Sequence, residues 1–345
     1  MAAPLTCEIG RRRPTYGLAS SAVTRPEIRP FRPDDVPAAG RLLAARHAAH
    51  RQVEPLLAAR FEDPAVAAAE IEAVLAAGGS GAVAVAVEGD EVTGYLLGQS
   101  KPSPVWGPNA WVEAAGQAVP QAETVRDLYA AAGQEWVERE LSAHYVLVPA
   151  HDSALVDAWF RLGFGLQHVH GICELPDQPS TPPAHLTIRA ARRADIPVLA
   201  ELDLALPAHQ ATAPTWSAGE VPTLEEAVAD WEESFDDEGY GYLVAEHDGR
   251  VVGAAVGCGL EKSSTHKSLS QPEHAGFLGF AAVLPEARGL GAGRTLGEAT
   301  FDWMRDSGFT SAVTDWRATN LLSSRTWPRL GYRPSFLRLH RHLGY

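Results

Sequence analysis

The chain has 345 residues, of which 46% are hydrophobic and 21% charged, and its formal net charge is −14. This length favours two domains of ordinary size, and the acidic charge argues against binding to nucleic acid. The three cysteines are scattered and fit neither a disulfide framework nor a Cys-x-x-Cys metal site. Because the sequence shows neither a membrane-spanning stretch nor the apolar core of a signal peptide, we expect a cytoplasmic protein without a membrane partner.

The sequence contains two copies of one plan. "IRPFRPDDVP" (28–37) is similar to "IRAARRADIP" (188–197), and "AWFRLGFG" (158–165) to "TWPRLGYR" (326–333), at separations of 160 and 168 residues. Repeats of this kind indicate repeated structural units. We therefore expect the following parts along the chain: a disordered tail (1–25), a first domain (26–175), a proline-rich linker (176–185) and a second domain (186–345).

Apolar periodicity and turn residues predict the same order of strands and helices in both copies. Gly/Asp turns at 87–98 and 246–257 indicate a hairpin in each copy. The order predicts an α/β (α+β) fold of two tandem domains, each with a mixed, mostly antiparallel sheet flanked by helices. The elements expected in the second copy are strand 186–190, helices within 194–206 and 222–235, strands 241–246, 250–259 and 276–283, helix 291–306, strand 310–315, helix 320–330 and strand 334–342.

A glycine-rich loop joins a buried strand to a helix in the second copy. The apolar run "FLGFAAVLP" (277–285) is typical of a strand buried on both faces, and "RGLGAGRTLGEA" (288–299) turns from glycines into a helical pattern. Backbone N–H groups at a helix start bind anions, and glycines let a phosphate approach closely. The loop therefore predicts a pyrophosphate site, with Arg288 and Arg294 as cations at its rim.

Other phosphate loops do not fit this spacing. A Walker loop needs Gly-Lys-Ser/Thr, and none of the three lysines of the chain lies here. A dinucleotide fingerprint needs a glycine or alanine where Arg294 stands. The remaining pattern, Arg-x-x-Gly-x-Gly from Arg288 through Gly291 to Gly293, resembles the coenzyme A loop of the GCN5-related N-acetyltransferase (GNAT) family.

A second segment supports the same resemblance. The GNAT helix after the fifth strand reads Asn-x-x-Ala-x-x-x-Tyr-x-x-x-Gly-Phe, and "NLLSSRTWPRLGY" (320–332) follows its spacing with Asn320, Ser323 and Trp327. The resemblance implies that acetyl-CoA lies between the fourth and fifth strands of the second copy. The cofactor-binding residues that it implies are Ala281, Ala282, Val283, Arg288, Gly289, Gly291, Ala292, Gly293, Arg294, Thr295, Asn320, Ser323 and Trp327.

The catalytic groups are less clearly marked. The family's usual acid is a tyrosine at the position of Trp327, whose indole N–H cannot serve as an acid at neutral pH. We expect Trp327 to wall the coenzyme channel and Ser323, or water, to assist the departing thiolate. No carboxylate lies within the strand 277–285, so the candidate bases are Asp315 and His274, with Glu273 as a further possibility.

The first copy departs from the coenzyme pattern. In the aligned copies Pro120 stands opposite Arg288, Glu123 opposite Gly291 and Val125 opposite Gly293. A carboxylate and a branched side chain would repel a pyrophosphate, so we expect a degenerate domain. His168 and His170 alternate on a predicted strand, with His144 and His151 near them in sequence. Since no metal-binding spacing accompanies these histidines, we predict no metal.

These observations predict an N-acyltransferase that transfers acetyl from acetyl-CoA to a primary amine of a small molecule. The acidic run 230–240 and the polar loop 261–275 are expected on the acceptor side. A mycothiol-synthase-like or an aminoglycoside-type acetyltransferase is an alternative within this class. A coenzyme A-binding sensor or scaffold without catalysis is the alternative outside it. We expect a monomer or a homodimer.

Overall fold

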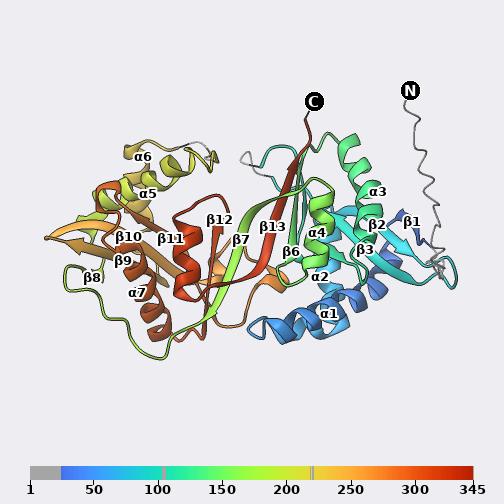
Figure 1. Ribbon diagram of the computed structural model, residues 1–345, viewed down its shortest axis with the longest axis horizontal. Helices are drawn as coiled ribbons and strands as arrows, with labels where there is room; N and C mark the ends of the chain where they lie inside the picture. Colours follow the sequence, from blue (N-terminus) through green and yellow to red (C-terminus); the bar gives the residue numbers. More distant parts are fainter. Residues whose placement is uncertain (1–24, 103–105, 218, 220, 345) are drawn as a thin grey trace, which may run out of the picture.

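The computed structural model describes residues 25–102, 106–217, 219 and 221–344. The predicted N-terminal tail lies outside these residues except for Arg25. Within the described residues, no helix combines the length and apolarity needed to cross a membrane. The elements of the first half are β1 (Glu27–Pro30), α1 (Val36–Val53), α2 (Pro64–Ala76), β2 (Ser80–Val85), β3 (Val92–Gly98), β4 (Asn109–Val112), β5 (Gln117–Ala118), α3 (Thr124–Glu138), β6 (Ala143–Pro149), α4 (Ser153–Arg161) and β7 (Gly165–Glu174) (Figure 1).

The second half repeats this order, except that one strand stands where the first half has β4 and β5. Its elements are β8 (Thr187–Ala190), α5 (Ile196–Gln210), α6 (Leu224–Ser234), β9 (Tyr240–His247), β10 (Arg250–Gly259), β11 (Ala275–Val283), α7 (Ala292–Asp306), β12 (Ser311–Arg317), α8 (Ser323–Thr326) and β13 (Arg333–His342). The helix predicted over 320–330 is shorter, because Pro328 has no N–H to donate to the carbonyl of Ser324. The chain continues there as a 3₁₀-helix, Trp327–Leu330.

Two sheets organise these elements. A four-stranded sheet has the order β1-β2-β3-β5, and a nine-stranded sheet has the order β4-β6-β13-β7-β12-β11-β10-β9-β8. The pairs β4–β6 and β11–β12 are parallel, and the other named pairs are antiparallel. The prediction of mixed, mostly antiparallel sheets flanked by helices is therefore confirmed.

The two halves exchange their last strands. β7 comes from the first half but pairs with β12 of the second half, with Cys173 opposite Ala312. β13 comes from the second half but pairs with β6 of the first, with Leu339 opposite Val146. β7 and β13 lie side by side at the centre of the molecule (Figure 1). The proline-rich linker separates the repeats in sequence, whereas the sheet joins them in space.

The repeated Arg and Asp of the sequence tie a strand to the following helix. In the second half Arg189 of β8 donates two hydrogen bonds to the carboxylate of Asp195, at 2.7 and 3.0 Å. Arg29 and Asp35 do the same in the first half, at 2.8 and 2.7 Å. The hydrogen bonds from Arg189 hold the pKa of Asp195 below its ordinary value. These pairs fix where α1 and α5 leave their sheets.

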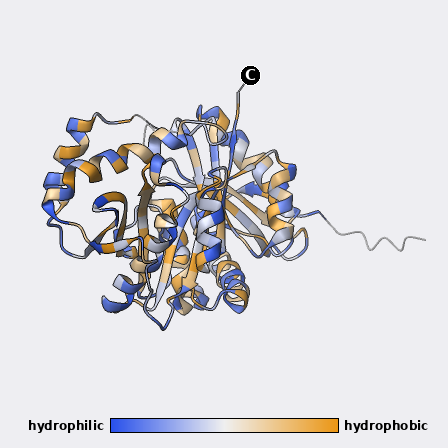
Figure 2. Ribbon diagram, turned by 60° about the vertical axis from the view of Figure 1, so that its left-hand side comes forward, coloured by the Kyte–Doolittle hydropathy of each residue, from blue (hydrophilic) through white to orange (hydrophobic). Residues whose placement is uncertain are grey.

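Helices cover both faces of strands β9 and β10. Val244 of β9 packs in one apolar cluster with Leu199 of α5, while its neighbour Ala245 packs in another with Leu296 of α7. Successive side chains of a strand point to opposite faces, so α5 and α6 lie on one face and α7 on the other (Figure 1). The helices carry both hydrophobic and hydrophilic residues, as expected for helices with one face on a sheet (Figure 2).

A buried histidine of α1 makes stability depend on pH. The His47 side chain is 0% exposed, its Nε2 lies 2.8 Å from the carbonyl oxygen of Ala58, and burial lowers its pKa from 6.5 to about 4. Between these pH values the unfolded chain binds the proton and the folded chain does not. The contribution of His47 to the free energy of unfolding is therefore complete above pH 6.5 and is lost as the pH falls toward 4. The loss from this residue amounts to about 3 kcal/mol.

We expect the variant His47→Gln, whose amide can still donate to Ala58, to show a smaller loss of unfolding free energy than the wild type between pH 7 and pH 5. Urea unfolding at the two pH values measures the difference. The exposed His274 gives the control: His274→Gln should keep the wild-type pH dependence. Equal slopes for the wild type and His47→Gln would contradict the assignment.

Candidate active site

Strands β11 and β12 separate halfway along β11. Their parallel pairing runs from Ala275 opposite Ser311 to Leu278 opposite Thr314 and stops there. Gly279 is skipped in the register of β11 with β10, which makes a one-residue bulge at the same point. Beyond the bulge β11 continues to Val283, so the backbone of its last residues faces an opening rather than a neighbouring strand on the β12 side.

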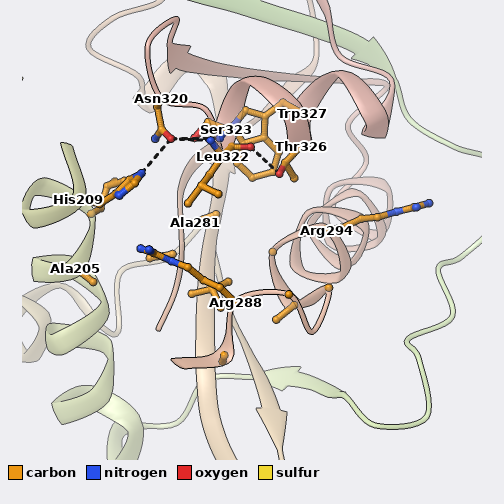
Figure 3. A pocket seen from close by; sticks show the side chains of 18 of the residues that line it. Ala205, His209, Ala281, Arg288, Arg294, Asn320, Leu322, Ser323, Thr326 and Trp327 are labelled. Atoms are coloured by element: carbon orange, nitrogen blue, oxygen red, sulfur yellow. Dashed lines mark hydrogen bonds between the residues drawn. The ribbon is translucent and has the colours of Figure 1, made fainter. Parts of the chain in front are cut away.

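A cavity of about 400 Å³ occupies this opening. It lies between the end of β11, the glycine loop with the start of α7, helix α8 and one face of α5 (Figure 3). Every residue predicted to bind the cofactor except Thr295 lines it. The lining residues are Ala205, Leu206, His209, Ala281, Ala282, Val283, Ala287, Arg288, Gly289, Gly291, Ala292, Gly293, Arg294, Asn320, Leu322, Ser323, Thr326, Trp327 and Arg329.

The glycine loop exposes backbone amides at the start of α7. Gly289 and Gly291 have φ of +91° and +83°, which favour glycine. The N–H of Thr295 donates to the carbonyl oxygen of Gly291 at 3.0 Å, so the helical hydrogen bonds begin there. The amides of the three residues before Thr295 have no acceptor within the helix and point toward its N-terminal end. This is an anion-binding arrangement.

Two side chains of the loop region lie differently from the sequence expectation. Thr295 is 2% exposed, and its Oγ1 lies 3.2 Å from the carbonyl oxygen of Gly291, so its side chain packs against the helix. The Arg294 side chain points away from the cavity and pairs with Glu298 at 2.8 Å, whereas Arg288 extends into the cavity (Figure 3). Arg288 is therefore the cation available to an anion in the cavity.

Helix α8 closes the other side of the cavity. The Oδ1 atom of Asn320 accepts hydrogen bonds from the backbone N–H groups of Leu322 and Ser323, at 3.2 and 3.4 Å, so Asn320 holds the turn that leads into the helix. Nε2 of His209 on α5 lies 3.3 Å from the same oxygen. Trp327 is 8% exposed and packs in the apolar cluster beneath α7, which makes it a wall of the cavity.

Helix α5 supplies part of the cavity lining, and no local sequence motif indicates this. Ala205, Leu206 and His209 stand about 80 residues before the glycine loop, and no motif marks them. The repeat predicts a helix at this place, but only the folded structure shows which turn of that helix lies beside the glycine loop. Sequence reasoning therefore missed these three residues.

A second cavity, of about 540 Å³, lies on the face of β11 that α5 and α6 cover. Carboxylates from both helices and several aromatic rings line it. Burial and the neighbouring Asp230 raise the pKa of Asp203. Consecutive residues of β11 line the two cavities, Phe280 this one and Ala281 the other. Its acidic and aromatic lining comprises Asp203, Asp230, Asp237, Asp315, Trp231, Tyr240, Tyr242, Phe277 and Phe280.

Of the predicted catalytic residues, Asp315 and Ser323 reach these cavities. Asp315 follows Thr314, the last residue of β12 that pairs with β11, and lines the acidic cavity, while Ser323 lines the cavity of about 400 Å³. His274 and Glu273 precede β11, roughly 20 Å along an extended strand from Ala281. His274 is exposed, and Glu273 pairs with Arg60 at 3.5 Å. The structure brings neither of them to the site.

Buried histidines surround Asp315. Nε2 of His266 lies 4.0 Å from one of its carboxylate oxygens, and Nδ1 of His168 lies 4.0 Å from the other. Asp315 also stands opposite His170 in the register of β12 with β7. Burial lowers the pKa of all three imidazoles, which keeps them neutral at pH 7. The other two histidines considered with this strand lie elsewhere: His144 bonds to a tyrosine and His151 stacks on His50.

The corresponding place in the first half is filled by side chains. Arg46, at the position of Leu206, donates hydrogen bonds to the carbonyl oxygens of Ala114 (2.7 Å) and Gln117. The Gln117 amide donates to Leu147 at 2.9 Å and accepts from the indole of Trp159 at 3.1 Å. Arg46 and Gln117 therefore bond to one another and to their surroundings at the place in the first half that corresponds by the repeat to Leu206 of the cavity of about 400 Å³.

The fold and the cavity together define a class of protein: a splayed sheet with an anion-binding loop suits an enzyme that holds an extended, phosphate-bearing cosubstrate. Residues 206–332 match the profile of the family described as Acetyltransferase (GNAT) family. The second half of the chain therefore contains a segment similar to GNAT domains. No curated protein matches the chain.

Several solved structures are similar. A GCN5-related N-acetyltransferase from Sphaerobacter thermophilus is 16% identical with a TM-score of 0.53, and the match covers 92% of this chain and 95% of that one. A tandem GNAT protein from the clavulanic acid biosynthesis pathway is 16% identical (TM-score 0.47; 92% and 99% covered). An aminoglycoside N-acetyltransferase in complex with CoA is 22% identical (TM-score 0.36; 48% and 97% covered). The first likeness shows a shared fold over almost the whole chain.

Proposed function

We propose that the second half of the chain transfers an acetyl group from acetyl-CoA to the primary amine of a small, cationic molecule. The observation that carries this proposal is the juxtaposition of the helix-start amides, Arg288 and the unpaired edge of β11 around one cavity. The pyrophosphate binds the amides after Gly291. The pantetheine arm follows the open backbone from Ala281 to Val283.

The acidic cavity is the proposed acceptor site. It lies beside the same strand, β11, whose bulge residue Gly279 lines it, and Asp203, Asp230 and Asp237 supply negative charge. Carboxylates attract an ammonium group, and aromatic faces bind cations further. An amine with a second positive charge or with several hydroxyl groups suits this lining better than an apolar amine. The proposal therefore names a polycationic or amino-sugar acceptor.

The reaction follows from the positions of the two cavities along β11. The neutral amine attacks the thioester carbonyl, a C–N bond forms, and the C–S bond breaks with release of the coenzyme A thiolate. The backbone N–H groups of the open edge of β11 stabilise the carbonyl oxygen as it gains charge. The ammonium proton leaves toward Asp315, directly or through water. Ser323 or water donates a proton to the thiolate, because Trp327 cannot.

Titration calorimetry with coenzyme A tests the first part of this proposal. We expect one molecule bound per chain, because Arg46 and Gln117 fill the equivalent place in the first half. Two equal sites per chain, or none, would contradict the assignment. The control is Arg294→Ala, whose side chain points away from the cavity and whose loss should change the affinity little (Figure 3).

An acceptor screen tests the second part. Thiol release from acetyl-CoA should be fastest with diamines, polyamines and amino sugars and slow with amino acids, whose carboxylates the acidic cavity repels. Coenzyme A binding without turnover of any amine would instead favour the sensor or scaffold. The observation that favours this second function is Trp327, which stands where the family has a tyrosine as its usual acid.

A further inference from the structure

Three potential metal ligands from separate elements converge beneath the acidic cavity. His170 lies on β7, His266 in the loop before β11, and Asp315 on β12. One ligand atom of each lies within 4.8 Å of the others. His170 is 2% exposed and His266 is 0% exposed, whereas the Asp315 side chain is 22% exposed and lines the cavity. The group therefore has a buried side and a side open to solvent.

Three of the four ring nitrogens of His170 and His266 lack protein partners among the described residues. Neither Nδ1 nor Nε2 of His170 has a hydrogen-bond partner among the described residues, nor does Nε2 of His266. Leaving a buried polar atom unpaired costs about 1–3 kcal/mol. One such nitrogen from each histidine beside one carboxylate points to a ligand that satisfies these two nitrogens together.

A further contact orients His266 as a metal ligand. Its Nδ1 lies 3.0 Å from Oγ of Ser263, and both residues are buried. The contact aims Nε2 away from Ser263, and in the tautomer whose Nδ1–H donates to the serine oxygen the lone pair of Nε2 is free for a metal, as in metal-binding histidines in general. The free Nε2 then faces Asp315.

The guanidinium of Arg338 lies near these three side chains but bonds to other residues. The guanidinium of Arg338 bonds to His168 and to Gln167, the latter at 2.9 Å, and lies 5.1 Å and 5.4 Å from the ring centres of Trp106 and Trp111. These partners hold it on the His168 side of Asp315. The ring nitrogens of His170 and His266 are not among its hydrogen-bond partners.

We propose that His170, His266 and Asp315 bind one divalent transition-metal ion, with Zn²⁺ as the ion that this ligand set fits best. Two imidazoles and one carboxylate form a recurring zinc set that leaves one position open. Tetrahedral bonds of about 2.1 Å place ligand atoms about 3.4 Å apart, so the three side chains must close by about 1 Å. The open position faces the acidic cavity, because Asp315 lines it.

Binding of the metal does not depend on the proposed function. The part that the metal plays in the reaction rests on that function and adds to it. A divalent ion lowers the pKa of a bound water, so the hydroxide that this water forms by losing a proton to solvent would accept the ammonium proton at the edge of the acceptor cavity and become water again. The sequence predicts no metal because the three ligands stand in unrelated segments. Their juxtaposition arises from the exchange of β7 into the second half.

Metal binding is tested on the full chain without coenzyme A. After treatment with a chelator, calorimetry with Zn²⁺ and visible absorption with Co²⁺ should show one tight site per chain with tetrahedral Co²⁺ bands. Asp315→Asn and His266→Ala should weaken Zn²⁺ at least about 100-fold, and Ser263→Ala about 10-fold. His274→Ala, an exposed histidine outside the group, is the control and should bind like the wild type.

Circular dichroism and thermal unfolding show whether each variant is folded. If His266→Ala fails to fold, Asp315→Asn and Ser263→Ala still decide the question. Absence of one-to-one binding in the wild type, or equal affinity in the wild type and Asp315→Asn, overturns the metal site. The coenzyme A titration is a separate measurement, so the acetyltransferase proposal can stand or fall independently.

Discussion

Gly293→Val should weaken coenzyme A binding by at least 100-fold, about 2.7 kcal/mol. Gly293 lies in the first turn of α7, where the unpaired amides face the cavity. A branched side chain there occupies the space that phosphate oxygens need to reach those amides. Because the pyrophosphate is the group that the valine displaces, calorimetry with coenzyme A itself measures the loss.

The fold should tolerate this substitution. A Cβ atom at Gly293 would lie 3.6 Å from a methyl carbon of Val283, which is ordinary contact, and the backbone there does not have the positive φ that favours glycine. The first half carries Val125 at the equivalent position of α3, fully buried. Gly165→Val, at an open position of β7, is the matched control and should bind coenzyme A normally. Unchanged affinity in folded Gly293→Val would refute the pyrophosphate assignment.

Gly291 is a less decisive position for the same test. Its φ of +83° places it in the left-handed region, so any side chain strains the backbone as well as crowding the site. A loss of binding in Gly291→Glu could then arise from a displaced helix start. The choice of Gly293 separates the effect on the ligand from the effect on the loop.

The sequence predicts the elements well where their signals are local. The glycines before α7, the apolar run of β11 and the turn before β10 each specify their own conformation, and the expected ranges agree closely with the structure. The repeat adds the order of elements in the first half. Helix 320–330 is the exception, since Pro328 prevents the final turn from forming α-helical hydrogen bonds.

The directions of two side chains of α7 could be predicted from helical spacing. Arg294 and Glu298 stand four residues apart on one helix, which favours an ion pair along the surface rather than an arginine over the phosphate site. Thr295 can bond back to the carbonyl of residue 291, as threonines in helices often do. Both facts follow from helical spacing once the helix start is placed.

The long-range parts of the site could not be predicted in this way. Nothing local indicates that β7 leaves its own half to pair with β12, because strand pairing depends on partners far away in sequence. That exchange sets His170 opposite Asp315 and brings the loop with His266 beside both. The lining of the coenzyme cavity by α5 has the same origin. Each depends on tertiary packing rather than on a motif.

Asp315→Asn should lower the rate of acetyl transfer by about 10²- to 10⁴-fold, the range for loss of a general base. Asparagine keeps the shape of the side chain but cannot accept the ammonium proton. Coenzyme A affinity should stay within about twofold, because Asp315 lines the acceptor cavity and not the coenzyme cavity. Steady-state thiol release and calorimetry measure the two quantities separately.

The pH profile distinguishes a base from a structural carboxylate. At high pH the acceptor amine loses its proton in solution, so the deficit of Asp315→Asn should shrink as the pH rises, whereas a damaged site stays slow at every pH. Asp236→Asn is the control, because Asp236 is exposed and pairs with Arg193 outside the cavity. Wild-type rates in Asp315→Asn would remove Asp315 from the mechanism. Comparison of chelated and Zn²⁺-loaded wild type then shows how the carboxylate acts: equal rates mean that it accepts the proton alone, and a faster loaded enzyme means that it acts as a ligand.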